Sequence, residues 1–306
     1  MNWFLIALVA PILWAVVNVA DNYLVQRFSQ KEKERTSGGL VLFSSLIGLF
    51  IAFFIFIFIK GIFDIPNIDK LILFICGGLT IVWIVFYLYA LEIEDVSSVV
   101  PWFLTVPIFG YFLGYFFLGE ILTRGQILGS IVVLLGSIII SFDFKEGKRR
   151  FKKKPAFYML FASLAIAIAG FLFKFVTIDG NFWVSSFWEY LSLGFVGLLI
   201  YLFSHKYRNE FNYMNKTGGK KIFIINIVSE LMSVSGNILT NFAIMLAPIT
   251  MVYLVSSFQP AILLVLTIFT TKFFPKILKE DLSKEVLIPK IIAIVIMIIG
   301  SFLLLK

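Results

Sequence analysis

Three carboxylates stand inside stretches that are otherwise apolar, and they have the greatest capacity for chemistry. Asp21, Glu189 and Glu230 each lie within a run long enough to cross a membrane. A charge at the centre of a bilayer costs at least about 2.5 kcal/mol on insertion scales, so each carboxylate is a candidate for binding a cation or a proton. We count one base, Lys174, against these three acids. This balance favours a cationic or zwitterionic solute over one that carries phosphates.

The carboxylates also have structural interpretations that the sequence leaves open. Glu189 can pair with Lys174 on the preceding span, or it can lie near the membrane interface. Glu230 can be a hydrogen-bonded packing residue. Lys174 stands close to the end of its span, where a long side chain can extend its amine to the interface.

Polar residues recur at helical spacing around two of the carboxylates. Asn18 and Asn22 fall on the same helix face as Asp21, and Asn237 falls on the same face as Glu230. The second of these faces also carries Ser233, Thr240 and Asn241, and it is the clearest polar stripe in the chain. Each stripe therefore predicts one wall of a polar site within the membrane.

Aromatic residues accompany the same segments. Trp188 directly precedes Glu189, and an aromatic face beside a carboxylate suits an organic cation. Trp83 and Tyr87 lie one helical turn apart, although aromatic residues at this spacing also pack in cores. The predicted substrate-binding residues are Trp14, Asn18, Asp21, Trp83, Tyr87, Trp188, Glu189, Glu230, Asn237 and Asn241.

Membrane-spanning helices must position these residues. The chain has 306 residues, of which 60% are hydrophobic and 14% charged, and its mean hydropathy is +0.99. Runs of about 20 apolar residues, the length of a helix that crosses the hydrocarbon layer, alternate with short polar breaks. The alternation of barrel strands is absent, which predicts an all-α integral membrane protein. The ten predicted transmembrane helices cover 3–26, 39–59, 71–91, 96–118, 125–143, 156–176, 182–203, 222–246, 249–271 and 287–305.

Basic residues gather beside the spans. Most of the 26 Lys and Arg residues follow an odd-numbered span, which predicts that those connections are cytoplasmic and that both termini lie outside. The densest run, "KEGKRRFKKK" at 145–154, is interpreted as a topology anchor, with binding of anionic lipid as the alternative. The net charge of +8 follows from this topology and does not predict a nucleic-acid partner.

Two parts of the chain repeat one arrangement of turns and prolines. "YALEIEDVSSVVPWFLTVP" at 89–107 aligns with "FAIMLAPITMVYLVSSFQP" at 242–260, which places Pro107 opposite Pro260. We predict two five-helix units, 1–143 and 156–306, joined by a basic cytoplasmic linker at 144–155. An odd number of spans inverts the second unit relative to the first, which is a common build for secondary transporters.

The stretch "LGEILTRGQILGSIVVLLGSIII" resembles the segment between the fourth and fifth helices of the EamA family, in the drug/metabolite transporter (DMT) superfamily. The resemblance implies two inverted five-helix units and transport of a solute. We expect Glu120 to cap the following helix, with direct handling of substrate or proton as the alternative. The second half has no Gly-Glu pair at the corresponding place, where it reads "KFFPKILKEDL". The matching residues are Gly119, Glu120, Thr123, Gln126, Gly129 and Gly136.

From the resemblance and the buried acids we expect a secondary active transporter that works by alternating access and is coupled to protons. Its substrate would be a small polar organic metabolite such as an amino acid, an amine or another cationic or zwitterionic solute. The alternative is an accessory or flippase-like subunit for the translocation of a lipid-linked sugar, which would need a polar groove that faces lipid.

The same residues bear on other classes of protein. No gathering of acids, His or metal ligands appears at one membrane surface, so we do not expect an enzyme. No phosphate loop or metal-ligand spacing predicts a cofactor or a metal. The expected partners are the small-molecule substrate, protons and the lipid bilayer. We expect a monomer or homodimer with many passes through a prokaryotic inner, or plasma, membrane.

Overall fold

Helices make up nearly all of the protein. The computed structural model describes residues 2–29, 37–121, 123–140, 142–143, 150–151, 153–178 and 180–304. Its first half contains α1 (Asn2–Ser29), α2 (Gly38–Phe58), α3 (Asn67–Leu91), α4 (Val96–Val99), the 3-10 helix η1 (Val100–Thr105), α5 (Val106–Leu118) and α6 (Arg124–Ile140). A short antiparallel pair, β1 (Phe142–Asp143) and β2 (Arg150–Phe151), follows.

The second half repeats this order of helices. It contains α7 (Lys153–Thr177), α8 (Phe182–Phe203), α9 (His205–Leu246), α10 (Ile249–Val255), the 3-10 helix η3 (Ser256–Phe258), α11 (Gln259–Phe273) and α12 (Lys284–Leu304). The predicted all-α class is therefore confirmed.

Eight helical segments in the described residues are long and apolar enough to cross a membrane, which agrees with the predicted integral membrane class. They match eight of the ten predicted spans. The other two predicted spans fall on α6, which has 17 residues, and on α12, and neither is in this set. Membrane crossing by α6 and α12 stays a prediction.

The fourth and ninth predicted spans are each interrupted by a 3-10 helix. The fourth consists of α4, η1 and α5, and the ninth of α10, η3 and α11. Pro107 and Pro260 stand in the first turn of α5 and α11. Because proline has no N–H to donate to the preceding turn, it favours a helix start at these positions and a joint before it.

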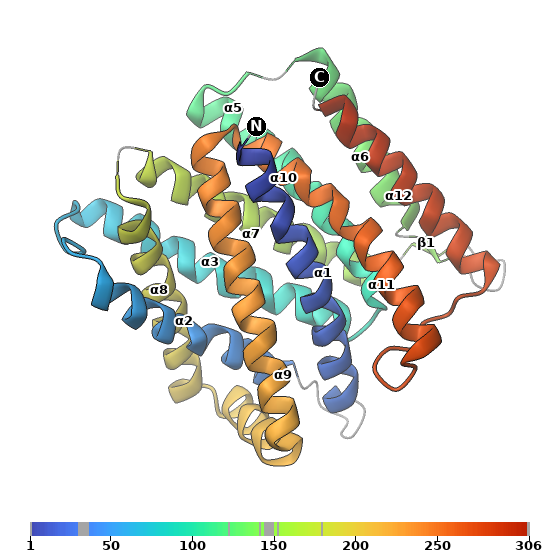
Figure 1. Ribbon diagram of the computed structural model, residues 1–306, viewed down its shortest axis with the longest axis horizontal. Coiled ribbons are helices and arrows are strands. Elements are labelled where there is room, and N and C mark those ends of the chain that lie inside the picture. Colours follow the sequence, from blue (N-terminus) through green and yellow to red (C-terminus); the bar gives the residue numbers. More distant parts are fainter. Residues whose placement is uncertain are drawn as a thin grey trace.

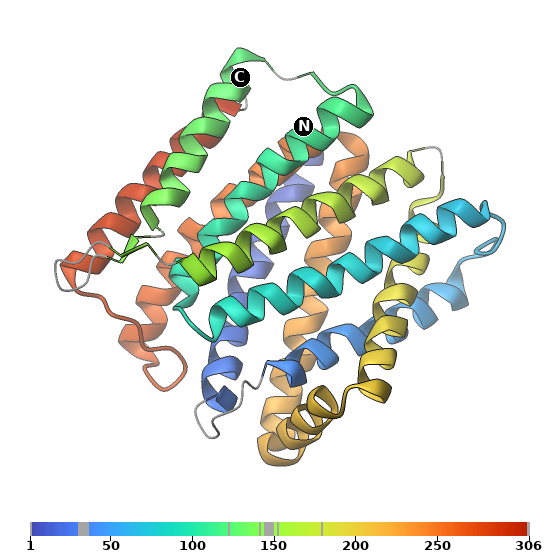
Figure 2. The ribbon, with the colours of Figure 1, turned by 180° about the vertical axis from the view of Figure 1, so that it is seen from behind.

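The packing of the helices repeats when the two units are exchanged (Figure 1). α1 packs on α9 as α7 packs on α3, and α11 packs on α1 as α5 packs on α7. α2 pairs with α8, and α6 pairs with α12 at one edge of the bundle, as Figure 2 shows from behind. This pattern is the one expected of two units related by a pseudo-two-fold axis. Both chain ends lie at the same end of the bundle (Figure 1).

The central helices approach each other closely at glycines. A Cβ added at Gly77 of α3 would lie 2.2 Å from the backbone oxygen of Glu189 in α8. A Cβ at Gly48 of α2 would lie 2.6 Å from the oxygen of Tyr190 in the same helix. Close approach through small residues is a usual way to hold helices together in lipid, where the hydrophobic effect does not act between them.

One predicted loop is a helix. Residues 204–221 were expected to form a connection, but α9 begins at His205, and Gly219 marks a kink with a φ of 64°. Ser204 caps the first turn, and Tyr207, Phe211 and Met214, spaced by three or four residues, face the core. An amphipathic helix therefore precedes the eighth span. Of the predicted linker 144–155, residues 144–149 and 152 lie outside the described residues, and α7 begins at Lys153.

Candidate substrate cavity

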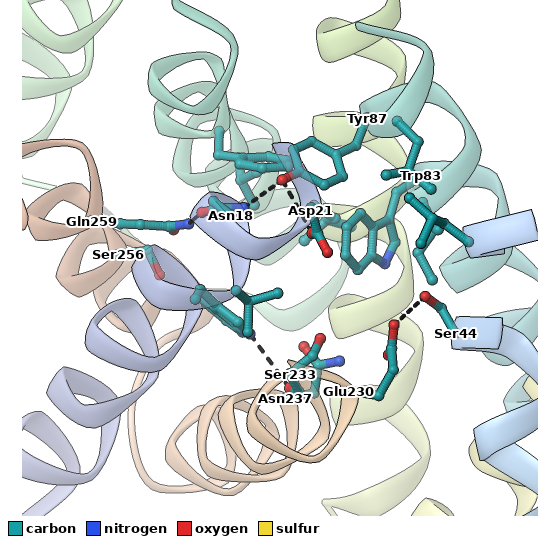
Figure 3. Close-up of a pocket in the computed structure, with 18 of the residues that line it drawn as sticks. Asn18, Asp21, Ser44, Trp83, Tyr87, Glu230, Ser233, Asn237, Ser256 and Gln259 are labelled. Carbon is teal, nitrogen blue, oxygen red and sulfur yellow. Dashed lines mark hydrogen bonds between the residues drawn. The ribbon is translucent and has the colours of Figure 1, made fainter. Parts of the chain in front are cut away.

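A cavity of about 120 Å³ lies between the two units, next to the joints of the fourth and ninth spans (Figure 3). α1, α2, α3 and α9 supply most of its polar wall. Seven of the ten predicted site residues line it: Trp14, Asn18, Asp21, Trp83, Tyr87, Glu230 and Asn237. The helical spacing on α1 and on α9 thus identified two walls of one cavity.

A chain of hydrogen bonds holds Asp21 at the cavity wall. The hydroxyl of Tyr87 donates to Asp21 Oδ2 over 3.3 Å. Asn18 donates from Nδ2 to the Tyr87 hydroxyl over 2.7 Å, and Gln259 donates from Nε2 to Asn18 Oδ1 over 2.6 Å. Four side chains from α1, α3 and α11 are joined in this way, as the dashed lines in Figure 3 show.

Glu230 is the second carboxylate of the cavity. The hydroxyl of Ser44, from the first turns of α2, donates to its Oε1. Nearby, Trp14 donates from Nε1 to the backbone oxygen of Ser233 over 3.4 Å, which fixes the indole against α9. A Cβ at Gly236 would lie 2.6 Å from that indole nitrogen, so a glycine is needed for this contact.

The cavity combines negative charge with aromatic walls. No Lys, Arg or His is among the described residues that line it, while Asp21 and Glu230 are both present. Trp83 and Phe103 lie 6.2 Å apart between ring centroids, and Tyr87 and Phe103 lie 5.5 Å apart. A cation between such groups gains both ion pairing and cation–π attraction.

Three predicted site residues lie elsewhere. Trp188 donates from Nε1 to the backbone oxygen of Ile62 over 2.9 Å and packs in the core between α8 and the loop after α2. Asn241 donates from Nδ2 to Glu189 over 3.0 Å. Neither these residues nor Glu189 line the cavity. The stripe on α9 therefore divides, with Asn237 in the cavity and Asn241, one turn later, bonded to α8.

The proposed pairing of Glu189 with Lys174 is wrong. Lys174 instead lies 2.9 Å from Glu120, and the two side chains are only 9% and 13% exposed. The Lys174 amine also donates to the backbone oxygen of Ala247 over 2.8 Å. Glu120 follows α5 at a sharp turn that requires the positive φ of Gly119, and this turn carries its carboxylate toward the end of α7 and the start of α10. Lys174 therefore pairs with an acid of the first unit and not with the acid on the span that follows it.

Glu120 caps a helix, but a different helix from the one expected. Its two carboxylate oxygens each accept from the backbone N–H of Ile249 over 3.2 Å, at the first residue of α10. The start of α6 is capped by its own residues, because the Gln126 side chain accepts from Thr123 N over 2.7 Å and Thr123 Oγ1 accepts from Gln126 N over 3.3 Å. This is the reciprocal arrangement of a capping box.

The second half has a counterpart of Glu120 that the sequence comparison did not find. Glu280, in the longer connection after α11, accepts from the backbone N–H of Ser97 at the start of α4 over 3.3 Å and lies 3.5 Å from the Lys290 amine. Burial raises the pKa of Glu280 above its usual range, and Lys290 partly offsets this effect. Each unit therefore caps the broken span of the other with a glutamate. Both glutamates also contact a lysine of the second unit, Lys174 in α7 and Lys290 in α12. The extra residues in the second connection displaced Glu280 and hid the correspondence.

Several cavity residues were not predicted. Ser44, Ser256 and Gln259 line the wall, and they stand in short polar groups within apolar runs, where no stripe at helical spacing marks them. Gln259 directly precedes Pro260, and a polar residue beside a proline within an apolar run was the available signal. Among the described residues, no group of three or more His, Cys, Asp or Glu could hold a metal ion.

Comparisons with known proteins agree with this architecture. Residues 1–142 match the model of the EamA-like transporter family. A solved crystal structure superposes with a TM-score of 0.64 over 99% of this chain and 96% of that chain, at 13% sequence identity, which is a likeness of fold alone. Comparison with curated proteins gives no match. The first half of the chain is therefore similar to the EamA-like transporter family of the DMT superfamily, as the segment around Gly119 and Glu120 indicated.

Proposed function

We propose that the protein is a secondary active transporter of small organic cations or zwitterionic amines. The observation that carries the proposal is the charge of the cavity: Asp21 and Glu230 line it, and no basic side chain among the described residues balances them there. Two carboxylates in one low-dielectric cavity repel each other, and the repulsion is relieved by a cation or a proton. A phosphate-bearing solute would add to that repulsion.

The same arrangement of carboxylates supports proton coupling. In the empty cavity one carboxylate takes up a proton, which removes the repulsion between Asp21 and Glu230. An entering ammonium group replaces that proton as the positive charge, so the proton leaves. Substrate and proton therefore compete for one site, which is the condition for exchange of the two across the membrane.

Alternating access is supported by the symmetry of the contacts. The two units exchange their packing partners, so a second arrangement with the roles of the units reversed would open the cavity toward the other side. The joints at η1 and η3 lie next to the cavity and divide the fourth and ninth spans into shorter helices. Such joints are the places where a span can bend without loss of a continuous hydrogen-bond ladder.

Uptake into proteoliposomes tests the proposal. The panel contains a quaternary ammonium ion, a primary aryl amine, a neutral amino acid and an organic phosphate, each with and without a pH gradient. We expect uptake of the cationic or zwitterionic solutes, driven by the gradient and lost in Asp21→Asn and Glu230→Gln. Glu285→Gln, at an exposed carboxylate in the first turn of α12, is the matched control. Uptake of the phosphate alone, or equal uptake by all variants, would contradict the proposal.

We further propose that both termini face outward, because the basic connections follow the odd-numbered spans. Single cysteines in a Cys76→Ser background test this orientation in intact cells. Lys216→Cys, in the amphipathic part of α9, should resist a membrane-impermeant thiol reagent. Lys60→Cys, in the connection after α2, should react with it. The reverse labelling pattern would overturn the orientation.

A further inference from the structure

Gln259 is a buried amide at the joint of the ninth span. It is the first residue of α11, directly after η3, and only 4% of it is exposed. A buried amide costs free energy unless its polar atoms are bonded. Its Nε2 donates to Asn18 Oδ1 over 2.6 Å, so the joint is tied to α1 through the side chain.

The hydrogen-bond chain that begins at Gln259 has one direction. Gln259 donates to Asn18, Asn18 donates to Tyr87, and Tyr87 donates its hydroxyl proton to Asp21. The amide of Asn18 and the phenol of Tyr87 are 5% and 3% exposed, so solvent does not offer alternative partners. Hydrogen bonds in a buried series polarise one another. The strength of the bond that Tyr87 donates to Asp21 therefore depends on the other two hydrogen bonds. The series of hydrogen bonds provides a donor for Asp21 Oδ2 and leaves Oδ1 of the same carboxylate for a solute.

The first unit has no such connection at the corresponding position. The offset of 153 that aligns Pro107 with Pro260 places Val106 opposite Gln259. Val106 is the first residue of α5 and also lines the cavity, but its side chain has no polar atom. The two joints are thus alike in backbone and proline and differ in this side chain.

We propose that Gln259 is a positioning residue of the cation site, which couples the occupancy of Asp21 to the joint between α10 and α11. This inference rests on the proposed function. When a cation binds the free oxygen of Asp21, the carboxylate turns toward it and the Tyr87 bond, the longest of the three, loosens. The change passes through Asn18 to Gln259, at a joint where Pro260 has no N–H to hold the preceding turn. The ninth span therefore responds to the cavity, while the fourth span does not respond by this path.

A double-mutant cycle tests the coupling, with binding of the quaternary ammonium ion and the aryl amine followed by tryptophan fluorescence of purified protein. Gln259→Met keeps the length of the side chain and removes the donor. We expect it to raise the dissociation constant about three- to tenfold, the worth of one hydrogen bond. Tyr87→Phe should have a similar effect, and the two changes together should weaken binding no more than Tyr87→Phe alone, because either change already breaks the chain.

Gln26→Met is the matched control, since Gln26 also donates to an asparagine of α1, Asn22, but does not line the cavity. It should leave binding unchanged. If Gln259→Met does not fold, Asn18→Ala breaks the same chain from its middle and enters the same cycle. Additive effects of the paired changes, or binding by Gln259→Met equal to that by Gln26→Met, would overturn the coupling and leave the proposed function standing. If the unaltered protein binds no cation, the proposed function fails, and the coupling fails with it.

Discussion

Carboxylates below the surface of this protein have two kinds of surroundings. Glu120 and Glu280 each contact a lysine and a backbone N–H at the start of a helix in the other unit. Asp21 and Glu230 accept from hydroxyl groups and line a cavity in which no described residue carries a positive charge. The first pair is neutralised within the fold, whereas the second pair keeps a charge that a solute or a proton must neutralise. On the proposed function, the comparison separates carboxylates that hold the units together from carboxylates that are available to a solute.

The lysine-paired carboxylates have a regular placement. Glu120 caps the start of α10 and Glu280 caps the start of α4, so each broken span is held by a glutamate that follows the broken span of the other unit. Glu120 follows the end of the fourth span, while Glu280 contacts the beginning of that span. The two contacts therefore lie at opposite ends of the bundle.

The largest effect is expected on stability, when one partner is removed from the Glu120–Lys174 pair. Glu120→Gln leaves the Lys174 amine buried without a counter-charge, and breaking such a pair costs about 3–5 kcal/mol. The melting temperature of the protein in detergent should fall clearly. Adding Lys174→Met to Glu120→Gln should restore most of the loss, because no buried charge then remains unpaired. An unchanged melting temperature in Glu120→Gln alone would contradict the structural role of the lysine-paired carboxylates.

The cavity carboxylates should show the opposite behaviour. Asp21→Asn and Glu230→Gln remove a charged partner of the solute, which lowers uptake by about 10- to 100-fold. Their melting temperatures should stay the same or rise, since a buried charge without a cationic partner is removed. Parallel uptake and thermal unfolding measurements check both statements. A fall in stability as large as that of Glu120→Gln would show that these carboxylates also hold the fold.

A smaller effect is expected from the pH dependence of stability at Glu280. Burial raises its pKa in the folded protein above the usual value, so the folded state holds the proton more tightly than the unfolded state. The stability that Glu280 contributes is therefore present below its ordinary pKa and is lost as the pH rises through the raised value. The melting temperature of the unaltered protein minus that of Glu280→Gln should therefore be more positive at pH 4.5 than at pH 8. A difference that grows with pH would reverse this assignment.

The fold was predictable from the sequence wherever hydrophobic runs and prolines specify it. The length of the apolar segments placed eight of the ten predicted spans, and the aligned Pro107 and Pro260 stand at the joints of the fourth and ninth spans. The helix at 205–218 was missed because its polar composition resembles that of a loop. Only three residues, Tyr207, Phe211 and Met214, form its core-facing side. Its order comes from packing against the bundle, which a local pattern does not show.

The candidate site was predictable only in part, for a physical reason. Spacing on one helix shows which residues share a face, and this placed Asn18 with Asp21 and Asn237 with Glu230. It does not show which neighbouring helix covers that face. Glu189 was therefore grouped with Glu230, although α8 turns it toward Asn241, and Lys174 was paired with the wrong acid. The partners of Glu120 and Gln259 lie more than 50 residues away, and only the tertiary structure brings them together.

The most direct test of the account is equilibrium binding of a quaternary ammonium ion to the purified protein, followed by the fluorescence of Trp14 and Trp83 at the cavity wall. The account predicts saturable binding that is competed by protons, lost in the Asp21→Asn/Glu230→Gln double variant and retained in the Glu120→Gln/Lys174→Met variant. Binding that persists without both cavity carboxylates, or that depends on the Glu120–Lys174 pair instead, would contradict it.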